Sequence, residues 1–349
     1  MTETSPPAEG VGEAQAPADE SRSLTDLAGR IAGFESNSVL IATVAIAVVI
    51  GVLHPAFFSW GQIKDMLQQS VYVGVLAMGM AFLISMREID LSVGSIFGLT
   101  LISSALLIKH GMDPWLAGVI GIFLGAAMGL VNAILIQIIT IPAIVATLAT
   151  LSMFRGLALA LSDGQQVTGL PTRHPFFAKF GGEFLGLPAS VWVMILLAIG
   201  LTAVLRLTPF GYRIRSIGSN PEAATFSGIS IPRVRVQALV LMGALAGLSG
   251  VLGLAFFESG DPNIGTGFEL EAIAATVIGG TPLRGGSATV VGAMIGAILV
   301  GGVVNSGLVY FNVPVNWSQF ATGAVILLAV SLDSLLRRRR RGQSSGLAL

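Results

Sequence analysis

The stretch Gly218-Ser-Asn-Pro-Glu-Ala-Ala-Thr-Phe-Ser-Gly-Ile229 is polar, although most of the chain around it is apolar. It has the pattern of a short helix with a defined start and end. Asn220 can cap the N-terminus, Pro221 suits the first helical position, and Glu222 favours the positive end of the helix dipole. Gly228 can supply the left-handed residue that ends the helix. We therefore expect a short amphipathic helix that projects from a membrane protein, where a soluble partner can bind it.

Arginines on both sides of this helix indicate which side of the membrane it faces. Three precede it and two follow it: Arg206, Arg213, Arg215, Arg233 and Arg235. Arginine-rich loops of membrane proteins lie in the cytoplasm. The sequence therefore predicts a cytoplasmic loop over residues 213–235.

The composition excludes a soluble protein. Of 349 residues, 53% are hydrophobic and only 11% are charged, with a mean hydropathy of +0.82, whereas soluble domains carry about 25% charged residues. The formal net charge of zero gives no general attraction to nucleic acid.

The absence of cysteine excludes disulfides, thiolate metal sites and cysteine nucleophiles. Because the three histidines are scattered, at 54, 110 and 174, we expect no metal centre. We predict an all-α polytopic membrane protein.

About ten apolar stretches approach the roughly 20 residues that span a bilayer. They lie at 38–53, 63–85, 91–109, 115–139, 142–162, 190–206, 235–257, 270–282, 288–310 and 316–335. With ten spans and a cytoplasmic N-terminus, the basic clusters at 206–235 and 337–341 both lie in the cytoplasm, as positive charge favours. The same topology places 163–189 outside, where its length and its Pro, Gly, Phe and His residues suit a docking surface.

The two ends of the chain differ from the apolar region of 38–336. Residues 1–37 are rich in Pro, Ala, Glu, Ser and Gly, so they bury too little apolar surface to order themselves. They also lack the basic start and cleavage site of a signal peptide. We expect a disordered cytoplasmic N-terminal tail, a membrane domain, and a basic cytoplasmic C-terminal tail over 337–349.

Glycines recur four residues apart within three of the predicted spans. They are Gly121, Gly125 and Gly129, then Gly243 and Gly247, then Gly292 and Gly296. Small residues at this spacing let helix backbones approach closely in lipid. We expect these glycines to serve helix packing.

A weak internal repeat suggests that the membrane domain has two pseudo-repeated halves. Residues 86–95 align with 278–287, and residues 129–132 align with 302–305. Transporters often consist of two such halves, with the substrate path at their junction. Chance similarity is the alternative, since few residues match.

Two interpretations are open for the charged residues between the second and third spans. A carboxylate at the middle of a bilayer costs ~2.5–3.5 kcal/mol, so such a group is usually paired or functional. Asp90, with Ser92 and Ser95, can anchor a bent loop near a transport pathway. Alternatively, these residues lie at the cytoplasmic surface, where Arg87 pairs with Glu88.

Polar residues within the spans are the candidates for a translocation pathway. Asn132 and Asn305 can each hydrogen-bond a hydroxyl group of a substrate or a neighbouring helix. With Asp90 and Ser92 they form our predicted pathway set. Arg155 extends either to the membrane interface, which we favour, or into an internal cavity.

The sequence lacks the motifs of an enzyme that works alone. It has no Gly-x-x-x-x-Gly-Lys-Ser/Thr phosphate loop, no His-Glu-x-x-His and no Gly-x-Ser-x-Gly. We therefore predict no catalytic residue and no bound cofactor or metal. If ATP drives transport, another subunit hydrolyses it.

Five blocks in order resemble one family over roughly residues 38–336. They are Ile-Asp-Leu-Ser-Val-Gly-Ser at 89–95, Ile-Pro-Ala-Ile-Val-Ala-Thr-Leu-Ala-Thr at 141–150 followed by Arg-Gly-Leu-Ala-Leu at 155–159, the 218–229 stretch, Gly-Gly-Thr-Pro-Leu-Arg-Gly-Gly at 279–286, and Asn-Ser-Gly-Leu at 305–308. The chain resembles the permease subunit of ribose-type ABC importers, within the wider group that includes branched-chain amino acid permeases.

This resemblance implies a function and a set of partners. Such permeases import monosaccharides such as ribose or xylose across the bacterial inner membrane, receiving them from an extracytoplasmic binding protein. The permease pairs with a second copy or a related permease, and cytoplasmic ABC ATPases bind its loop at 220–229. The implied ATPase-coupling residues are Asn220, Pro221, Glu222, Ala223, Ala224, Ser227, Gly228 and Ile229.

One position departs from the family pattern. The family commonly has two glycines before Ile-Asp-Leu-Ser, where this chain has Arg87 and Glu88. Their bulk and charge oppose the close backbone approach that glycines allow. We interpret the change as a sign of a different substrate or a different gate.

Two other functions remain open from the sequence. A branched-chain amino acid permease of the same class would carry a zwitterion in place of a sugar. An ion-coupled secondary transporter would work without an ATPase. The sequence does not name the sugar, and it does not distinguish a homodimer from a heterodimer.

Overall fold

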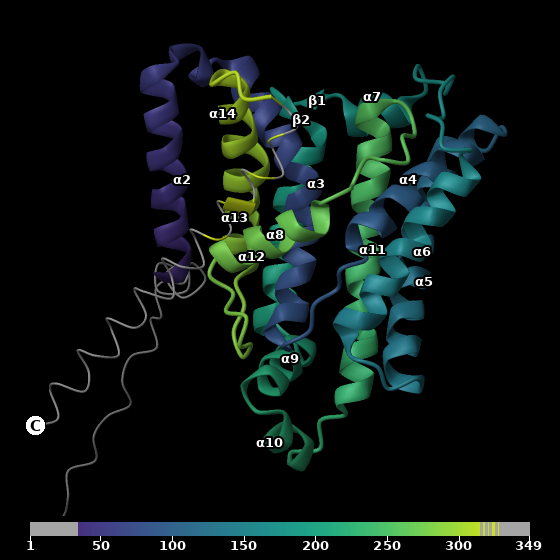
Figure 1. The fold of residues 1–349 in the computed structure, drawn as a ribbon, viewed down its shortest axis with the longest axis vertical. Helices are drawn as coiled ribbons and strands as arrows, with labels where there is room; N and C mark the ends of the chain where they lie inside the picture. The colour runs from purple at the N-terminus through teal and green to yellow at the C-terminus, as the bar shows by residue number, and fades with distance from the viewer. Residues whose placement is uncertain (1–33, 315–316, 318–319, 321–322, 325–326, 328–349) are drawn as a thin grey trace, which may run out of the picture. The chain divides into compact units, whose positions relative to one another are not determined.

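The computed structural model describes residues 34–314, 317, 320, 323–324 and 327. Helices dominate this part of the chain (Figure 1). They are α2 (Phe34–Leu53), η1 (Pro55–Phe58), α3 (Trp60–Ser85), α4 (Val93–Lys109), α5 (Pro114–Ile138), α6 (Ala143–Leu161), α7 (Pro175–Gly181), α8 (Ala189–Leu207), α9 (Pro209–Ser219), α10 (Pro221–Phe226), α11 (Ile231–Phe257), α12 (Phe268–Ile278), α13 (Val290–Ala297), η2 (Ile298–Val304) and α14 (Asn305–Tyr310). The prediction of a helical protein is confirmed.

Six of the described helices are long and apolar enough to cross a membrane. They are Trp60–Ser85, Pro114–Ile138, Ala143–Leu161, Ala189–Leu207, Ile231–Phe257 and Val290–Tyr310. The predicted spans 38–53 and 91–109 correspond to the shorter apolar helices Thr43–Leu53 and Val93–Lys109. The predicted span 270–282 corresponds to α12, whose 11 residues rise only about 16 Å, too little for a hydrocarbon core of about 30 Å. The count of ten spans is therefore not confirmed.

Several predicted segments lie wholly or mainly outside the described residues. These are the C-terminal tail at 337–349, most of the span at 316–335, and the tail at 1–37 apart from its last residues. Helix α2 begins at Phe34, so the tail boundary predicted at 37 lies inside a helix.

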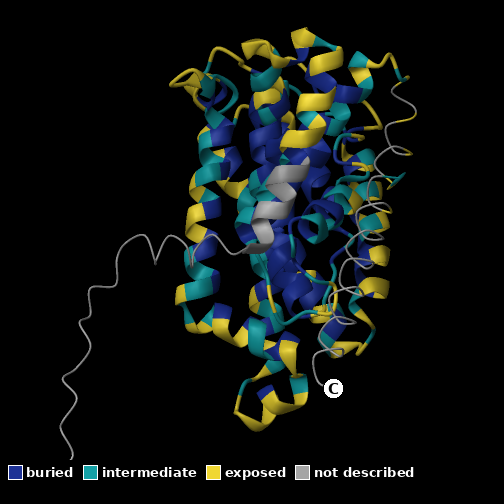
Figure 2. Cartoon of the chain, turned by 90° about the vertical axis from the view of Figure 1, so that its left-hand side faces the viewer, coloured by how far each residue is buried: buried dark blue, intermediate teal, exposed yellow. Residues whose placement is uncertain are grey.

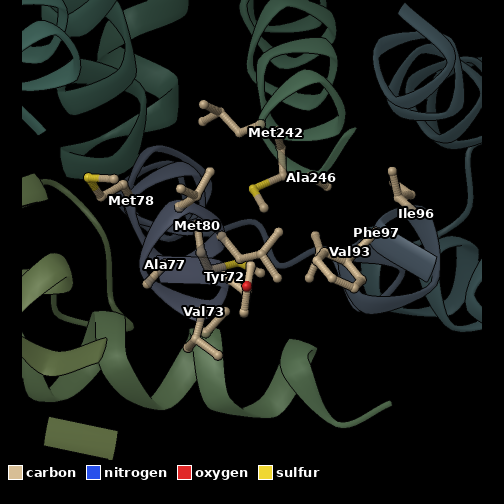
Figure 3. Close-up of a cluster of buried hydrophobic side chains, with 14 of the residues drawn as sticks. Tyr72, Val73, Ala77, Met78, Met80, Val93, Ile96, Phe97, Met242 and Ala246 are labelled. Carbon is tan, nitrogen blue, oxygen red and sulfur yellow. The ribbon is translucent and has the colours of Figure 1, made fainter. Parts of the chain in front are cut away.

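Helix α3 forms the centre of the packed core. Buried residues make up 89% of its most apolar window, against 28% for α6. Figure 3 shows Tyr72 and Met80 of α3 near Met242 of α11 and Phe97 of α4. Every residue of α3 from Ser70 to Ser85 is buried, as expected of a helical stretch that is mainly apolar on every face. Buried residues gather in the middle of the view in Figure 2 and exposed ones at its outer faces and ends.

Glycines bring α5 and α11 into backbone contact, as their spacing predicts. A Cβ built on Gly125 would lie 2.7 Å from the Cα of Gly247, and one on Gly243 would lie 2.9 Å from the Cα of Gly129. No side chain fits between the two helices at these points. The packing role predicted for these glycines is therefore confirmed.

Two short helices begin inside the molecule after non-helical segments. Residues 86–92 lead into α4, and residues 258–267 lead into α12. The two entrances meet, because a Cβ on Gly265 would lie 2.7 Å from the carbonyl oxygen of Gly94. Arg155 of α6 joins them by donating to the carbonyls of Pro262 at 2.5 Å and Gly94 at 3.4 Å. The guanidinium of Arg155 therefore binds carbonyls of the loop before α12 and of the first turn of α4.

The alignment that suggested two halves does not match the order of helices. Residues 129–132 lie on α5, the second helix after the 86–95 loop. Residues 302–305 lie on the first helical run after the 278–287 loop, which comprises α13, η2 and α14. The paired motifs therefore occupy different places in the chain order, so this alignment is wrong.

The segment predicted to be the external loop has its own short elements. It contains α7 and the antiparallel pair β1 (Glu183–Phe184) and β2 (Leu187–Pro188). Lys64 of α3 holds the pair through an ion pair with Glu183 at 2.5 Å. A bridge between Val167 and Gly260 ties the start of the segment to the loop before α12.

Candidate functional site

Helix α10 has the start and end that its sequence predicts. The side chain of Asn220 accepts a hydrogen bond from the backbone N–H of Ala223 at 3.0 Å. Pro221 occupies the first turn and Glu222 lies beside it. Gly228 has a φ of 80°, which glycine adopts without strain. The local structure predicted for this segment is confirmed.

The surface of α10 differs from the predicted coupling set at three residues, one of which is Thr225, exposed but absent from that set. Ala224 is buried at 4% exposure and packs against the body of the protein. Phe226, absent from the predicted set, is 93% exposed at the end of α10. A single large apolar residue in a polar segment was the sequence signal for Phe226, because such residues carry much of the energy at protein interfaces. Figure 1 shows α10 at the lower end of the molecule.

Arg87 contacts the residues just before α10. Its Nε donates to the carbonyl of Gly218 at 2.7 Å, and its Nη2 donates to that of Ser219 at 3.0 Å. These carbonyls end α9, where helical carbonyls lack intrahelical partners and carry partial negative charge. A cation placed there is stabilised by both effects.

Glu88 contacts a residue just after α10. Its Oε1 accepts from Nε of Arg235 at 2.7 Å and from Nη2 at 2.6 Å. Arg235 lies near the start of α11. The predicted alternative in which Arg87 pairs with Glu88 is therefore wrong, because each side chain finds a closer partner beside α10.

The backbone near Arg87 still makes the close approach that we expected its bulk to oppose. The N–H of Gly286 donates to the carbonyl of Ser85 at 2.9 Å, and a Cβ on Gly285 would lie 2.6 Å from Cγ of Arg87. Glycines on the facing loop supply the space, while the Arg87 side chain extends toward α9. That expectation is therefore wrong.

Asp90, Ser92 and Asn132 form one buried cluster with Thr150. Asp90 accepts from the N–H of Ser92 at 2.8 Å, from its hydroxyl at 2.7 Å, and from Nδ2 of Asn132 at 3.2 Å. Asn132 also donates to Ser92 at 2.8 Å and accepts from Thr150 at 2.7 Å. None of the four is more than 1% exposed. The cluster fixes the start of α4 to α5 and α6, so Asp90 anchors a bent loop, as one of our two interpretations held.

Asn305 does not join this cluster. Its Nδ2 donates to the carbonyl of Gly301 at 3.3 Å, one turn earlier. Its Oδ1 is buried without a hydrogen-bond partner among the described residues. The bond to Gly301 lies at the end of η2, a π-helical stretch, and such stretches are frequent at functional sites.

A cavity of about 470 Å³ opens beside the Glu88–Arg235 pair. It is lined by Arg87, Glu88, Ile89, Ile136, Thr140, Ile141, Pro142, Ala143, Ile144 and Arg235. Its walls therefore come from the segment before α4, the turn between α5 and α6, and the start of α11. Within the described residues no group of three or more His, Cys, Asp or Glu side chains could hold a metal ion.

The apolar helices, the central α3 and the buried polar cluster define a multi-pass membrane protein. The chain belongs to the family described as branched-chain amino acid transport system / permease component, which matches residues 62–330. The resemblance to a permease subunit drawn from the five sequence blocks is therefore confirmed.

Relatives with curated names match over most of their length. The ribose import permease protein RbsC of Bacillus subtilis (strain 168) is 40% identical over 82% of this chain and 89% of its own. The protein of the same name from Escherichia coli (strain K12) is 35% identical over 84% and 92%. The L-arabinose ABC transporter permease protein AraH of Azospirillum brasilense is 34% identical over 87% of each. No solved structure matches the chain.

Proposed function

We propose that this protein is the membrane-spanning translocation subunit of an ATP-driven importer for a monosaccharide such as ribose or xylose. The observation that carries the proposal is the likeness, over more than four-fifths of the chain, to permeases named for ribose and arabinose import. These names favour a sugar over a branched-chain amino acid, despite the wording of the family description. We expect no catalytic residue in the chain, since ATP hydrolysis belongs to a partner.

Helix α10 is the proposed contact for a cytoplasmic ABC ATPase. It is capped at Asn220, stopped at Gly228, and exposes Phe226 at its tip. A short rigid helix of this kind loses little conformational entropy on docking. Phe226 fits an apolar pocket in the partner, and Glu222 fits a basic residue.

The remaining partners follow from the proposed topology in the bacterial inner membrane. With both termini in the cytoplasm, the segment at 163–189 faces outward and receives the extracytoplasmic sugar-binding protein. A second permease, either the same chain or a related one, completes the pathway. The exposed apolar side chains on α5, α6 and α8 suit contact with lipid or with that second permease.

We propose that the polar residues Asp90, Ser92, Asn132 and Asn305 line the pathway in an opened state. The first three are bonded to one another and fully buried, so they reach the sugar only if α4 and α5 separate. Because the chain has no cysteine, a Ser92→Cys variant gives a labelling assay without background. We expect a polar maleimide to label it only during ATP-driven turnover. Absence of labelling in every state removes Ser92 from the pathway.

Uptake in proteoliposomes tests the whole proposal. The protein is reconstituted with its cognate ATPase and binding protein, and uptake of pentoses, hexoses and leucine is measured. We expect uptake of one sugar that requires ATP and both partners. Leucine uptake would identify an amino acid permease, and gradient-driven uptake by the chain alone would identify a secondary transporter.

A further inference from the structure

The 87–92 segment is fixed to other parts of the molecule at both ends. At its outer end, Arg87 bonds to the end of α9 and Glu88 bonds to the start of α11. At its inner end, Asp90 and Ser92 bond to Asn132 of α5. Figure 1 shows this segment as the non-helical trace that leaves the lower end of α3 and reaches α4. It therefore runs from both flanks of α10 to the buried cluster.

Arg87 has a backbone conformation that is unusual for a residue with a side chain. Its φ of 66° lies in the left-handed region, which glycine adopts freely and an arginine does not. The guanidinium compensates by binding two carbonyls that α9 leaves unpaired. Arginine at this position thus lacks the backbone freedom of glycine, but its side chain bonds to the residues that immediately precede α10.

The Glu88–Arg235 pair is partly buried from solvent, which strengthens the attraction between its two charges. The Glu88 side chain is 12% exposed and that of Arg235 is 26% exposed. Partly buried pairs are less screened by salt than surface pairs. Nε and Nη2 of Arg235 both bond to Oε1 of Glu88. Removing either side chain therefore leaves the charge of the other poorly solvated.

We propose that Arg87 and Glu88 are positioning residues that tie α10 to the buried Asp90 cluster. When a partner displaces α10, the flanking ends of α9 and α11 move with it. The 87–92 segment is too short to absorb that movement, because each extended residue spans at most about 3.5 Å. The movement therefore reaches Asp90 and the start of α4. This inference rests on the proposed role of α10 as the ATPase contact.

The test measures sugar taken up and ATP hydrolysed in the same proteoliposomes. Arg87→Gly removes the side chain while giving the left-handed position the residue that it favours, so the variant assembles. Glu88→Arg and Arg235→Glu each place two like charges together, and the double variant restores an opposite pair. Arg284→Ala is the matched control, because Arg284 is exposed on the neighbouring loop and, within the described part of the chain, forms no hydrogen bond or ion pair with the 87–92 segment.

We expect Arg87→Gly and each single charge reversal to lower the ratio of sugar taken up to ATP hydrolysed by roughly threefold or more, which is near the lower end of the coupling between residues of one hydrogen-bond or salt-bridge network. The double variant should recover most of the wild-type ratio, and Arg284→Ala should keep it. An unchanged ratio in Arg87→Gly, or a double variant as impaired as the single reversals, overturns the inference. A wild-type complex without ATP-dependent sugar uptake instead overturns the proposed function, so the two failures are distinguishable.

Discussion

Replacing Gly125 by alanine tests the backbone contact between α5 and α11. The new Cβ would lie 2.7 Å from the Cα of Gly247, and the carbonyl oxygen of Gly243 would be closer still. Favourable contact between carbon atoms needs about 3.5–4.0 Å, so the helices must separate by roughly 1 Å. Because every nearby atom is backbone, no side chain can rotate away to make room.

The expected cost follows from a comparison with Gly156, which has no atom within 4 Å of its ideal Cβ. Both substitutions lie in helices and gain a similar helix propensity of about 0.5–1 kcal/mol. That gain cancels in the difference between the two variants. What remains is the cost of overpacking, about 1–3 kcal/mol, which is roughly a 5- to 150-fold change in the ratio of folded to unfolded protein.

Unfolding by sodium dodecyl sulfate in mixed micelles measures this difference. Gly156→Ala should unfold at or above the detergent fraction of the wild type, and Gly125→Ala clearly below it. Equal midpoints for the two variants would refute the close crossing of α5 and α11. A more stable Gly125→Ala would refute it more strongly, since only an open interface accepts the extra methyl group without cost.

Three further changes test the candidate site. Asn220→Ala removes the cap of α10 and should weaken that helix by about 1 kcal/mol, seen as faster amide exchange in α10, whereas Asn220→Ser keeps a capping oxygen and should exchange like the wild type. Phe226→Ala should raise the dissociation constant for the ATPase by about 30-fold, as loss of an interface anchor does, while Thr225→Ala beside it should not; equal binding of the two variants excludes Phe226 as the anchor. Asn132→Ala should destabilise the fold by about 1–3 kcal/mol, because the Asp90 carboxylate loses a buried donor; an unchanged unfolding midpoint would contradict the cluster.

Features that depend on neighbouring residues could be predicted from the sequence. The cap at Asn220, the stop at Gly228 and the glycine rows of α5 and α11 all follow from spacings of four residues or fewer. The physical causes are local, since a cap needs only the next turn and a row of glycines exposes one face of one helix. The structure confirms each of these features.

Features that depend on distant residues could not be predicted in the same way. Glu88 finds its partner 147 positions away at Arg235, while the sequence suggested the adjacent Arg87. Asn132 meets Asp90 across 42 positions, and Arg155 meets Pro262 across 107. Charge and polarity identify such residues as unusual inside a membrane protein, but the choice of partner depends on how the helices pack.

The exchange of two glycines for Arg87 and Glu88 illustrates how the two kinds of information combine. The sequence indicates a departure from the family pattern at this position, and bulk alone predicts a looser backbone. The structure keeps the tight backbone, because Gly285 and Gly286 of the facing loop provide the space. The two charged side chains then extend to opposite flanks of α10. A position that glycine would leave flexible thus becomes a fixed link, and the departure concerns the transmission of movement from α10 more directly than the choice of sugar.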